Sequence, residues 1–188
     1  MPAMLPTLKG QKINLRRVHK SDAESIYRYA RDNEISRYTF LPNPYRIDDA
    51  YRFISTTHAA LRAKKAFIFG IEHKQEKKII GMISLEQVNF QHLLAEAGYW
   101  LGKQFWGQGI AKEALQLLLN FGFKQLKLNR IYARVMHPNT ASCRLLERTG
   151  FRKEGVMRKA VWRDGLWLDL IWYAILKDEF KEFMKRNR

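Results

Sequence analysis

The sequence predicts one α+β domain over residues 1–188, built around a mostly antiparallel sheet, with a loose lead-in at 1–9. Three observations favour this class. Segments with strand-like alternation occur in pairs joined by short turns, which is typical of antiparallel hairpins. A strand–helix–strand–helix segment lies between these pairs. The length of 188 residues fits a single domain, and no repeat or low-complexity linker divides the chain.

The first third of the chain is predicted to form one strand and two helices. Lys12 to Val18 alternates apolar and basic residues, which favours a strand. Ser21 to Glu24 has the spacing of a capping box, so we expect a helix to begin there and to continue to about Ala30. After an aromatic, proline-containing loop over 40–45, Asp48 is placed to cap a second helix. The inward positions of that helix are Tyr51, Ile54, His58 and Leu61.

The middle of the chain is predicted to contain three strands and the longest helix. Residues 66–73 and 79–88 are rich in β-branched side chains and are separated by the charged turn 75–78, which indicates a hairpin. Another strand is expected over 94–102, and residues 109–126 show the strongest helical pattern. The apolar stripe of that helix consists of Ile110, Ala114, Leu117, Leu118 and Phe121.

The last third is predicted to contain three strands and two helices. Strand 130–136 precedes a short helix over 140–149, which Gly150 ends. Residues 151–162 and 166–176 flank an Asp-Gly turn, so we expect a long antiparallel hairpin. A basic helix closes the chain.

The composition excludes several classes of protein. Hydrophobic residues make up 46% of the chain and aromatic residues 13%, which is too much apolar surface for a disordered protein. With Cys143 as the one cysteine, an intramolecular disulfide, a four-cysteine zinc site and a Cys-x-x-Cys redox pair are excluded. The five histidines lack metal-ligand spacing, so we expect no metal. No secretory signal or membrane-spanning run is visible, so we expect a cytoplasmic protein without a membrane partner.

The net charge bears on possible partners. Lys and Arg number 34 against 18 Asp and Glu, which gives a formal net charge of +16. Such a surface attracts polyanions and repels cationic small molecules at long range, so association with a ribosome or with RNA is one expectation. The excess is spread through the chain, and a solvated surface position is the simpler explanation for any single Lys or Arg.

The segment from Gln104 to Ala111 has the clearest binding chemistry. Gly107 and Gly109 allow a tight turn and a close approach of the backbone to a ligand, directly before the longest predicted helix. The backbone N–H groups of Gln108 to Ala111, with the helix dipole behind them, would form an anion site. A glycine-rich turn that only begins a helix is the alternative. The third glycine of a dinucleotide fingerprint and the Gly-Lys-Ser/Thr of a nucleotide P-loop are missing.

This loop resembles the coenzyme A pyrophosphate loop of the GNAT N-acetyltransferases, because Gln-x-x-Gly-x-Gly lies between a predicted strand and a predicted helix. Further segments resemble the RimJ/RimL branch of that superfamily, whose namesakes acetylate the N-termini of ribosomal proteins. These segments are Ala95–Leu101, Asn129–Ile131, His137–Ser142 and Leu146–Phe151. The resemblance extends from Leu8 to Phe180 and is most specific from Glu96 to Phe151.

The resemblance implies a GNAT fold with acetyl-CoA as cosubstrate. In that fold a mixed, mostly antiparallel sheet of about seven strands is flanked by helices, and two central strands splay into a V. Here those strands are 94–102 and 130–136, and pantetheine would lie between them against main chain near Tyr99 and Leu101. The residues implied to bind acetyl-CoA are Tyr99, Trp100, Leu101, Gln104, Gly107, Gln108, Gly109, Ile110, Ala111, Asn139 and Ser142.

Glu96 and Ser142 are the catalytic residues that the resemblance implies. Glu96, near the splay, would act as general base toward the acceptor ammonium, although a solvated strand carboxylate is a sufficient alternative. Ser142 would assist departure of the thiolate, because the tyrosine that many GNAT enzymes place seven residues after Asn139 is Leu146 here. Val161 stands where the RimL-type pattern has an acidic residue. A second carboxylate base is therefore missing at that position, which favours Glu96 as the general base.

Several other residues have a sufficient structural explanation. Asn139 can cap the short helix that follows it and contact the coenzyme as well. A covalent acetyl-Cys143 is conceivable, but no acid or histidine lies near in sequence to activate the thiol, so we expect a small helix residue. Four tryptophans are expected in the core or in a pocket wall, namely Trp106, Trp162, Trp167 and Trp172.

These features together predict transfer of an acetyl group from acetyl-CoA to a primary amine by direct attack in a ternary complex. The leading acceptor is the N-terminal α-amine of a protein of the ribosomal type. An α-amine has a pKa of about 7.7–8.0 against about 10.4 for lysine, so its deprotonation near neutral pH costs roughly 3.5 kcal/mol less. Two alternatives stay open: a small-molecule amine, including an antibiotic, as acceptor, and a non-catalytic RNA- or CoA-binding module. A monomer or a homodimer is expected.

Overall fold

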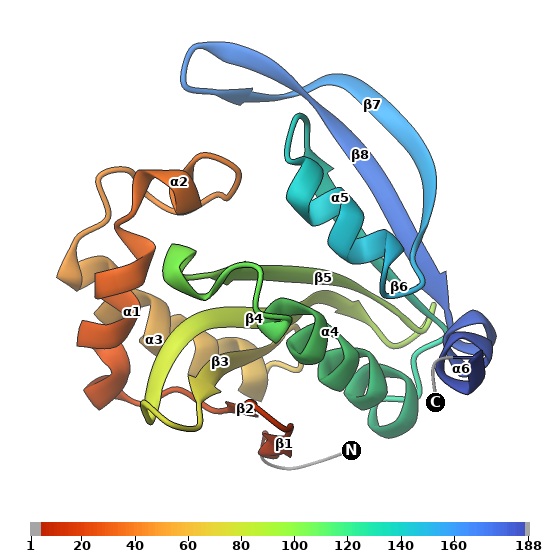
Figure 1. Cartoon of the computed structure of the whole chain (residues 1–188), viewed down its shortest axis with the longest axis horizontal. Helices are drawn as coiled ribbons and strands as arrows, with labels where there is room; N and C mark the ends of the chain where they lie inside the picture. Colours follow the sequence, from red (N-terminus) through yellow and green to blue (C-terminus); the bar gives the residue numbers. More distant parts are fainter. Residues whose placement is uncertain (1–4, 187–188) are drawn as a thin grey trace.

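The computed structural model describes residues 5–186 and shows an eight-stranded sheet flanked by helices (Figure 1). The strand order is β1-β2-β3-β4-β5-β6-β8-β7. The strands are β1 Leu8–Lys9, β2 Ile13–Arg16, β3 Phe67–His73, β4 Lys78–Asn89, β5 Leu94–Leu101, β6 Arg130–Met136, β7 Arg152–Arg163 and β8 Leu166–Leu176. The predicted sheet is confirmed, with one strand more than the expected seven. The additional strand, β1, lies in the predicted lead-in, of which residues 1–4 fall outside the described part.

Helices cover the sheet at both of its faces. They are α1 Ala23–Ala30, α2 Asn33–Ser36, α3 Ile47–Arg62, α4 Ile110–Asn120, α5 Thr140–Glu147 and α6 Lys177–Arg186. A π-helical turn, Phe121–Gln125, continues α4, so the predicted helix over 109–126 is nearly continuous. The short α2 is absent from the sequence prediction. Within residues 5–186, no helix combines the length and the apolar composition needed to cross a bilayer.

Two apolar clusters hold the sheet between these helices, because strand residues alternate between the two faces. On β4, Ile83 and Leu85 pack in the cluster that includes the buried side of α4. Met82 instead packs in the cluster that includes residues of α1 and α3. Ile79 belongs to that cluster too, because the β3–β4 register skips Ile80 and the alternation is interrupted there. In Figure 1, α4 lies in front of the central strands and α3 lies behind them. The central strands are therefore fixed from both faces.

β5 and β6 form a parallel pair that is hydrogen-bonded over a short stretch. The paired positions are Leu94 with Arg130, Ala95 with Ile131 and Glu96 with Tyr132. Beyond Glu96, β5 continues along β4 as far as Leu101, while β6 continues along β8 as far as Met136. The two strands therefore diverge into the predicted V, whose closed end is at Glu96.

β7 and β8 form the predicted long hairpin, which turns at Asp164 and Gly165 with φ angles of 49° and 81°. In Figure 1 this hairpin arches over α5, and its turn points toward α2. The guanidinium of Arg163 donates hydrogen bonds to the carbonyl oxygens of Ser36 and Leu41, at 2.8 and 3.2 Å. The end of the hairpin is therefore joined to α2 and to the loop that follows it.

α3 begins one residue before its predicted cap. The carboxylate of Asp49 accepts a hydrogen bond of 2.7 Å from the N–H of Arg46, so Asp49 and not Asp48 closes the first turn. The buried face also differs from the prediction, since Ala50 is buried and Tyr51 is exposed. The predicted inward face is therefore wrong at its first position.

An ion-pair network joins the start of α1 to the sheet. Arg16 on β2 pairs with Asp22 at 2.8 Å and with Glu72 at 2.7 Å. Asp22 also accepts a 2.8 Å hydrogen bond from the N–H of His19, and so takes the capping role predicted for Ser21. Burial alone would raise the pKa of Asp22, but the hydrogen bonds from Arg16 and His19 outweigh it, and the pKa lies below its usual value.

We expect Asp22→Asn to lower the free energy of unfolding by about 3 kcal/mol at neutral pH, because the half-buried Arg16 loses an anionic partner. The stabilisation is fully present above the ordinary Asp pKa of about 3.9 and is lost as the pH falls through the lowered pKa of the folded state. Urea unfolding of both proteins between neutral and acid pH measures this difference, which should shrink in acid. A difference that is the same at every pH would contradict the ion-pair explanation.

Candidate active site

The glycine-rich loop lies between the end of β5 and the start of α4. Gly107 and Gly109 have φ angles of +73° and +78°, and a Cβ at either position would meet no atom within 4 Å. The glycines therefore supply a left-handed backbone that other residues rarely adopt, and the space beside the loop is open. The N–H groups of residues 110–112 form the first turn of α4, where helix geometry leaves them without intrahelical partners. Loop and helix end together form a site suited to an anion.

Polar contacts fix this loop against the rest of the chain. The side-chain amide of Gln108 donates to the carbonyl oxygen of Gln104 at 2.8 Å. The ammonium of Lys12, just before β2, donates to the carbonyl oxygen of Gln108 at 2.7 Å. Glu113 on α4 accepts the backbone N–H of Lys12 at 3.1 Å and so holds this segment against the helix. Lys12 thus adds a positive charge beside the anion site, which the sequence analysis did not anticipate.

The open edge of β5 presents main-chain groups to the V. The N–H of Gly102, directly after β5, donates to the carbonyl of Ile80 on β4 at 2.8 Å, so the alternating main-chain groups of Tyr99 and Leu101 point away from β4. The indole N–H of Trp106 donates to the carbonyl oxygen of Leu101 at 2.7 Å. Tyr99 therefore offers the main-chain groups that an extended ligand between the strands would meet.

Ser142 lies in the first turn of α5, where two contacts fix it. Its N–H donates to the side-chain oxygen of Asn139 at 3.1 Å, so Asn139 caps α5 as predicted. Its hydroxyl lies 3.0 Å from the phenol oxygen of Tyr99 on β5. Burial raises the pKa of Tyr99 to about 12, so the phenol is protonated at neutral pH and can donate to Ser142. A tyrosine therefore stands beside Ser142, although position 146 is a leucine.

Glu96 lies at the closed end of the V and is held by an arginine. Its two carboxylate oxygens accept hydrogen bonds from Nε and Nη2 of Arg134 on β6, each at 2.7 Å. The amide of Gln87 donates to Oε2 of Glu96 at 3.1 Å. The hydrogen bonds to Glu96 raise the pKa of Arg134, whose guanidinium also lies 5.7 Å from the centroid of the Trp172 ring. Both oxygens of the predicted general base are therefore engaged.

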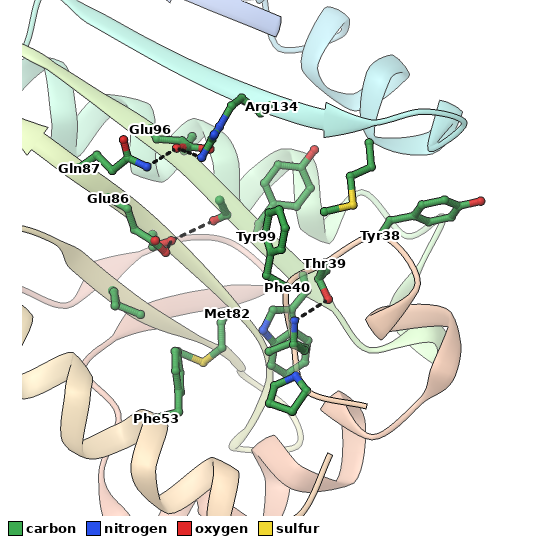
Figure 2. A pocket seen from close by; sticks show the side chains of 18 of the residues that line it. Tyr38, Thr39, Phe40, Phe53, Met82, Glu86, Gln87, Glu96, Tyr99 and Arg134 are labelled. Atoms are coloured by element: carbon green, nitrogen blue, oxygen red, sulfur yellow. Dashed lines mark hydrogen bonds and ion pairs between the residues drawn. The ribbon is translucent and has the colours of Figure 1, made fainter. Parts of the chain in front are cut away.

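A cavity of about 650 Å³ is lined by both arms of the V (Figure 2). β5 contributes residues 96–100, which include the predicted cofactor residue Trp100, and β6 contributes Arg134 and Met136. Figure 2 shows the carboxylates of Glu86 and Glu96 on one side of the cavity. Aromatic side chains from the α2–α3 loop and from α3 form much of the remaining wall, namely Tyr38, Phe40, Tyr45 and Phe53.

Five charged side chains line this cavity: Asp49, Arg52, Glu86, Glu96 and Arg134. Arg52 pairs with Asp49 on α3, and Arg134 pairs with Glu96. Glu86 accepts a 2.7 Å hydrogen bond from the hydroxyl of Ser84 and forms no ion pair with any residue between 5 and 186. Three carboxylates against two guanidinium groups leave the lining with a formal charge of −1, within a chain of charge +16.

The tryptophans differ from expectation. Trp106, Trp162 and Trp167 are 45%, 58% and 57% exposed, so their predicted core or pocket-wall position is wrong. Trp162 and Trp167 lie at the end of the β7–β8 hairpin, where Arg163 donates a hydrogen bond to the carbonyl oxygen of Ser36 on α2. Trp172 is half-buried and stacks on Tyr132 with ring centroids 5.3 Å apart.

In the described part of the chain, no group of three or more His, Cys, Asp or Glu side chains is placed to hold a metal ion.

Comparison with known proteins identifies the family. The family model described as an acetyltransferase (GNAT) domain matches residues 12–152. This chain belongs to the GNAT acetyltransferase family. The predicted resemblance is thereby confirmed, and acetyl transfer to nitrogen is its activity class.

Relatives connect this GNAT chain to the RimJ/RimL branch. YoaA of Bacillus subtilis, named an uncharacterized N-acetyltransferase, is 36% identical over 93% of this chain and 98% of its own. The [ribosomal protein uS5]-alanine N-acetyltransferase of Escherichia coli is 31% identical over 79% of each chain. A spermidine N(1)-acetyltransferase of Vibrio cholerae is 27% identical over 78% of this chain and 82% of its own. The solved structure of Mycobacterium smegmatis RimJ in complex with CoA-disulfide has a TM-score of 0.85 and 25% identity, covering 98% and 96% of the two chains.

The structure gathers most residues of the predicted site around the V, and it adds four contributions that the sequence analysis missed. The additions are the side chains of Lys12, Glu86, Tyr99 and Arg134. One signal for Glu86 was present, because Ser84 and Glu86 alternate on β4 and the next strand carries Glu96. No local pattern marks Lys12 or Arg134, since their partners are 96 and 38 positions away.

Proposed function

We propose that this enzyme transfers the acetyl group of acetyl-CoA to the N-terminal α-amine of a protein, with a ribosomal protein as leading acceptor, by direct attack in a ternary complex. The observation that supports this most is the position of the cavity. It is lined by both arms of the V and contains carboxylates, while the glycine-rich anion site lies at the end of one arm. A thioester between the strands and an amine in the cavity would therefore meet at the V.

The residues around the V fit acetyl-CoA. The N–H groups of the loop and of the first turn of α4, with the ammonium of Lys12, would bind the diphosphate. Main chain of Tyr99 would bind pantetheine in the manner of an added strand. The acetyl thioester supplies the electrophile, and a backbone N–H of β5 would bind its oxyanion. The hydroxyl of Ser142 would donate a hydrogen bond to the departing sulfur, and the phenol of Tyr99 would donate one to that hydroxyl. Trp100 and Asn139 stay predicted contacts of acetyl-CoA.

The charge of the cavity favours an acceptor with one positive charge. Its lining carries a single unpaired carboxylate, Glu86, which matches one ammonium group. A polyamine carries several ammonium groups, and a chain of charge +16 repels it at long range. The lower pKa of an α-amine adds to this preference, because more of it is neutral near pH 7.

An acetylation panel tests the proposal. Acetyl-CoA is supplied with peptides that bear free or blocked N-termini, with a lysine-containing blocked peptide and with spermidine, and products are located by mass spectrometry. We expect acetylation at free α-amines. Acetylation of spermidine alone would support the small-amine alternative. Absence of CoA release with every acceptor in the panel, together with RNA binding, would support the non-catalytic alternative.

The exposed end of the hairpin suggests how a polypeptide acceptor is held. Trp162 and Trp167 lie beside Arg163, which contacts the carbonyl of the cavity residue Leu41. We expect the double variant Trp162→Ala/Trp167→Ala to raise KM for an acceptor peptide about tenfold, through loss of exposed aromatic contact area. Steady-state kinetics with peptide and with acetyl-CoA varied in turn measures this. An equal rise in both KM values, or a change in oligomeric state, would contradict a role in peptide binding.

Other partners follow from the same proposal. A ribosomal acceptor would place the enzyme in the cytoplasm, and the basic surface would support association with the ribosome or its RNA. A monomer or a homodimer stays the prediction for the assembly.

A further inference from the structure

We propose that Glu86 on β4, and not Glu96 on β5, binds the acceptor ammonium and accepts its proton. This inference rests on the proposed transfer to an amine and assigns the residue that prepares that amine for attack. It replaces Glu96 as the proposed general base.

Strand pairing places both carboxylates on one face of the sheet. Glu86 and Glu96 are directly opposite each other in the β4–β5 ladder, and the next pair on the same face is Ser84 with Gly98. All four residues line the cavity. Figure 2 shows Glu86 and Glu96 side by side on the same wall. The position of Glu86 along the V therefore differs little from that of the residue predicted from the sequence.

The contacts of Glu96 make it a poor base. Both of its oxygens accept hydrogen bonds from Arg134 at 2.7 Å, and Gln87 adds a third at 3.1 Å. Protonation of Glu96 would break these charge-assisted bonds and would leave Arg134 without its anionic partner. The stacking of Arg134 over Trp172 further fixes the guanidinium in place. The Glu96–Arg134 pair therefore acts as a fixed part of the V.

The contacts of Glu86 leave it open to a cation. Ser84 donates one hydrogen bond to Oε1 at 2.7 Å, and no lysine, arginine or histidine between residues 5 and 186 forms an ion pair with it. Gly98 keeps the adjacent space clear, because a Cβ there would lie 3.3 Å from the Ser84 hydroxyl and 3.8 Å from Oε1 of Glu86. Asp49 and Glu96, the other carboxylates of the cavity, each hold an arginine. An incoming ammonium would therefore find its anionic partner at Glu86.

The step balances with these groups alone. The ammonium gives one proton to the carboxylate of Glu86, directly or through a water, and becomes a neutral amine. Its nitrogen attacks the thioester carbonyl, a C–N bond forms, and the C–S bond breaks. The second proton of the amine passes to the departing sulfur, which leaves as the thiol of CoA. Glu86 then releases its proton to solvent as the amide product leaves.

Kinetics of Glu86→Gln tests the assignment, with an amine that the unchanged enzyme acetylates. We expect kcat/KM for that amine to fall 10²–10⁴-fold, the range for loss of a general base, with KM for acetyl-CoA unchanged. The difference in kcat/KM between Glu86→Gln and the unchanged enzyme should become smaller as the pH rises above the amine pKa of about 8, where the amine is already neutral in solution. Glu86→Asp, which keeps the charge, should retain a pH profile like that of the unchanged enzyme.

Two further variants make the test specific. Glu24→Gln, on the exposed side of α1, removes the same charge outside the cavity and should leave the kinetics unchanged. Glu96→Gln should lower thermal stability, because Arg134 loses its partner, and should lower activity equally at all pH values. If Glu96→Gln shows the rescue at high pH and Glu86→Gln does not, the assignment is overturned. An unchanged enzyme that acetylates no amine would instead refute the proposed function, and this inference with it.

Discussion

Gly109→Val should abolish measurable binding of acetyl-CoA while the chain remains folded. Gly109 has a φ of +78°, a conformation that costs an ordinary L-residue about 1–2 kcal/mol and a β-branched residue more. The valine would therefore pull the backbone out of the left-handed region and turn the N–H groups of the first turn of α4 away from the diphosphate. Its methyl groups would also enter the open space beside the loop, where nothing lies within 4 Å of an added Cβ.

Gly165→Val provides the matched control. Gly165 has a φ of +81° and equally open surroundings, but it lies in the β7–β8 turn, away from the glycine-rich loop. Both variants should lose similar amounts of stability in thermal unfolding, because both carry the same backbone strain. Only Gly109→Val should lose affinity for acetyl-CoA in calorimetry, with a Kd raised at least about a hundredfold, or roughly 2.7 kcal/mol. Equal affinities of the two variants would remove the loop from the binding site.

The sequence was sufficient to predict the position of most strands and helices and of the glycine-rich loop, because these depend on local patterns of residues. Alternation and helical spacing place every strand except β1 and every helix except α2. Both exceptions are short elements, of two and four residues, that present too few positions for a period to be recognised. The glycine-rich loop was recognisable because its glycines and the helix after them are contiguous in the chain, and its predicted role toward the diphosphate came from the resemblance to GNAT enzymes.

Contacts between distant segments could not be predicted in this way. The ion pair of Glu96 with Arg134 joins residues 38 positions apart, and it depends on where two diverging strands place their side chains. The same holds for Tyr99 and Ser142, which are 43 positions apart. Composition was also misleading for Trp162 and Trp167, since large apolar residues are usually buried but the end of this hairpin extends past the core. The local patterns thus predicted the framework of the site, while its acid–base contacts required the structure.

Ser142→Ala should lower kcat about a hundredfold with little change in the Kd of acetyl-CoA. The hydroxyl of Ser142 would act on the sulfur only as the C–S bond breaks, so its loss affects the transition state more than the bound substrate. The phenol of Tyr99, 3.0 Å from that hydroxyl, would polarise it by donating a hydrogen bond. Tyr99→Phe should therefore lower kcat as well, by about tenfold, since Ser142 keeps its hydroxyl but loses the donor behind it.

A double-mutant cycle decides whether the two residues act as one unit. If the phenol acts through the serine hydroxyl, Tyr99→Phe has no further effect once Ser142 is alanine, and the double variant is as slow as Ser142→Ala alone. If the losses in kcat of the two single variants multiply in the double variant, Tyr99 acts on the substrate independently of Ser142.

The pH dependence of kcat gives a second check. Because burial raises the pKa of Tyr99 to about 12, the phenol keeps its proton throughout the neutral and mildly alkaline range. The pH profiles of both variants should therefore run parallel to that of the unchanged enzyme up to about pH 10. If the loss of kcat in these variants disappeared at alkaline pH, Ser142 and Tyr99 would act on deprotonation of the amine, together with Glu86, and not on departure of the sulfur.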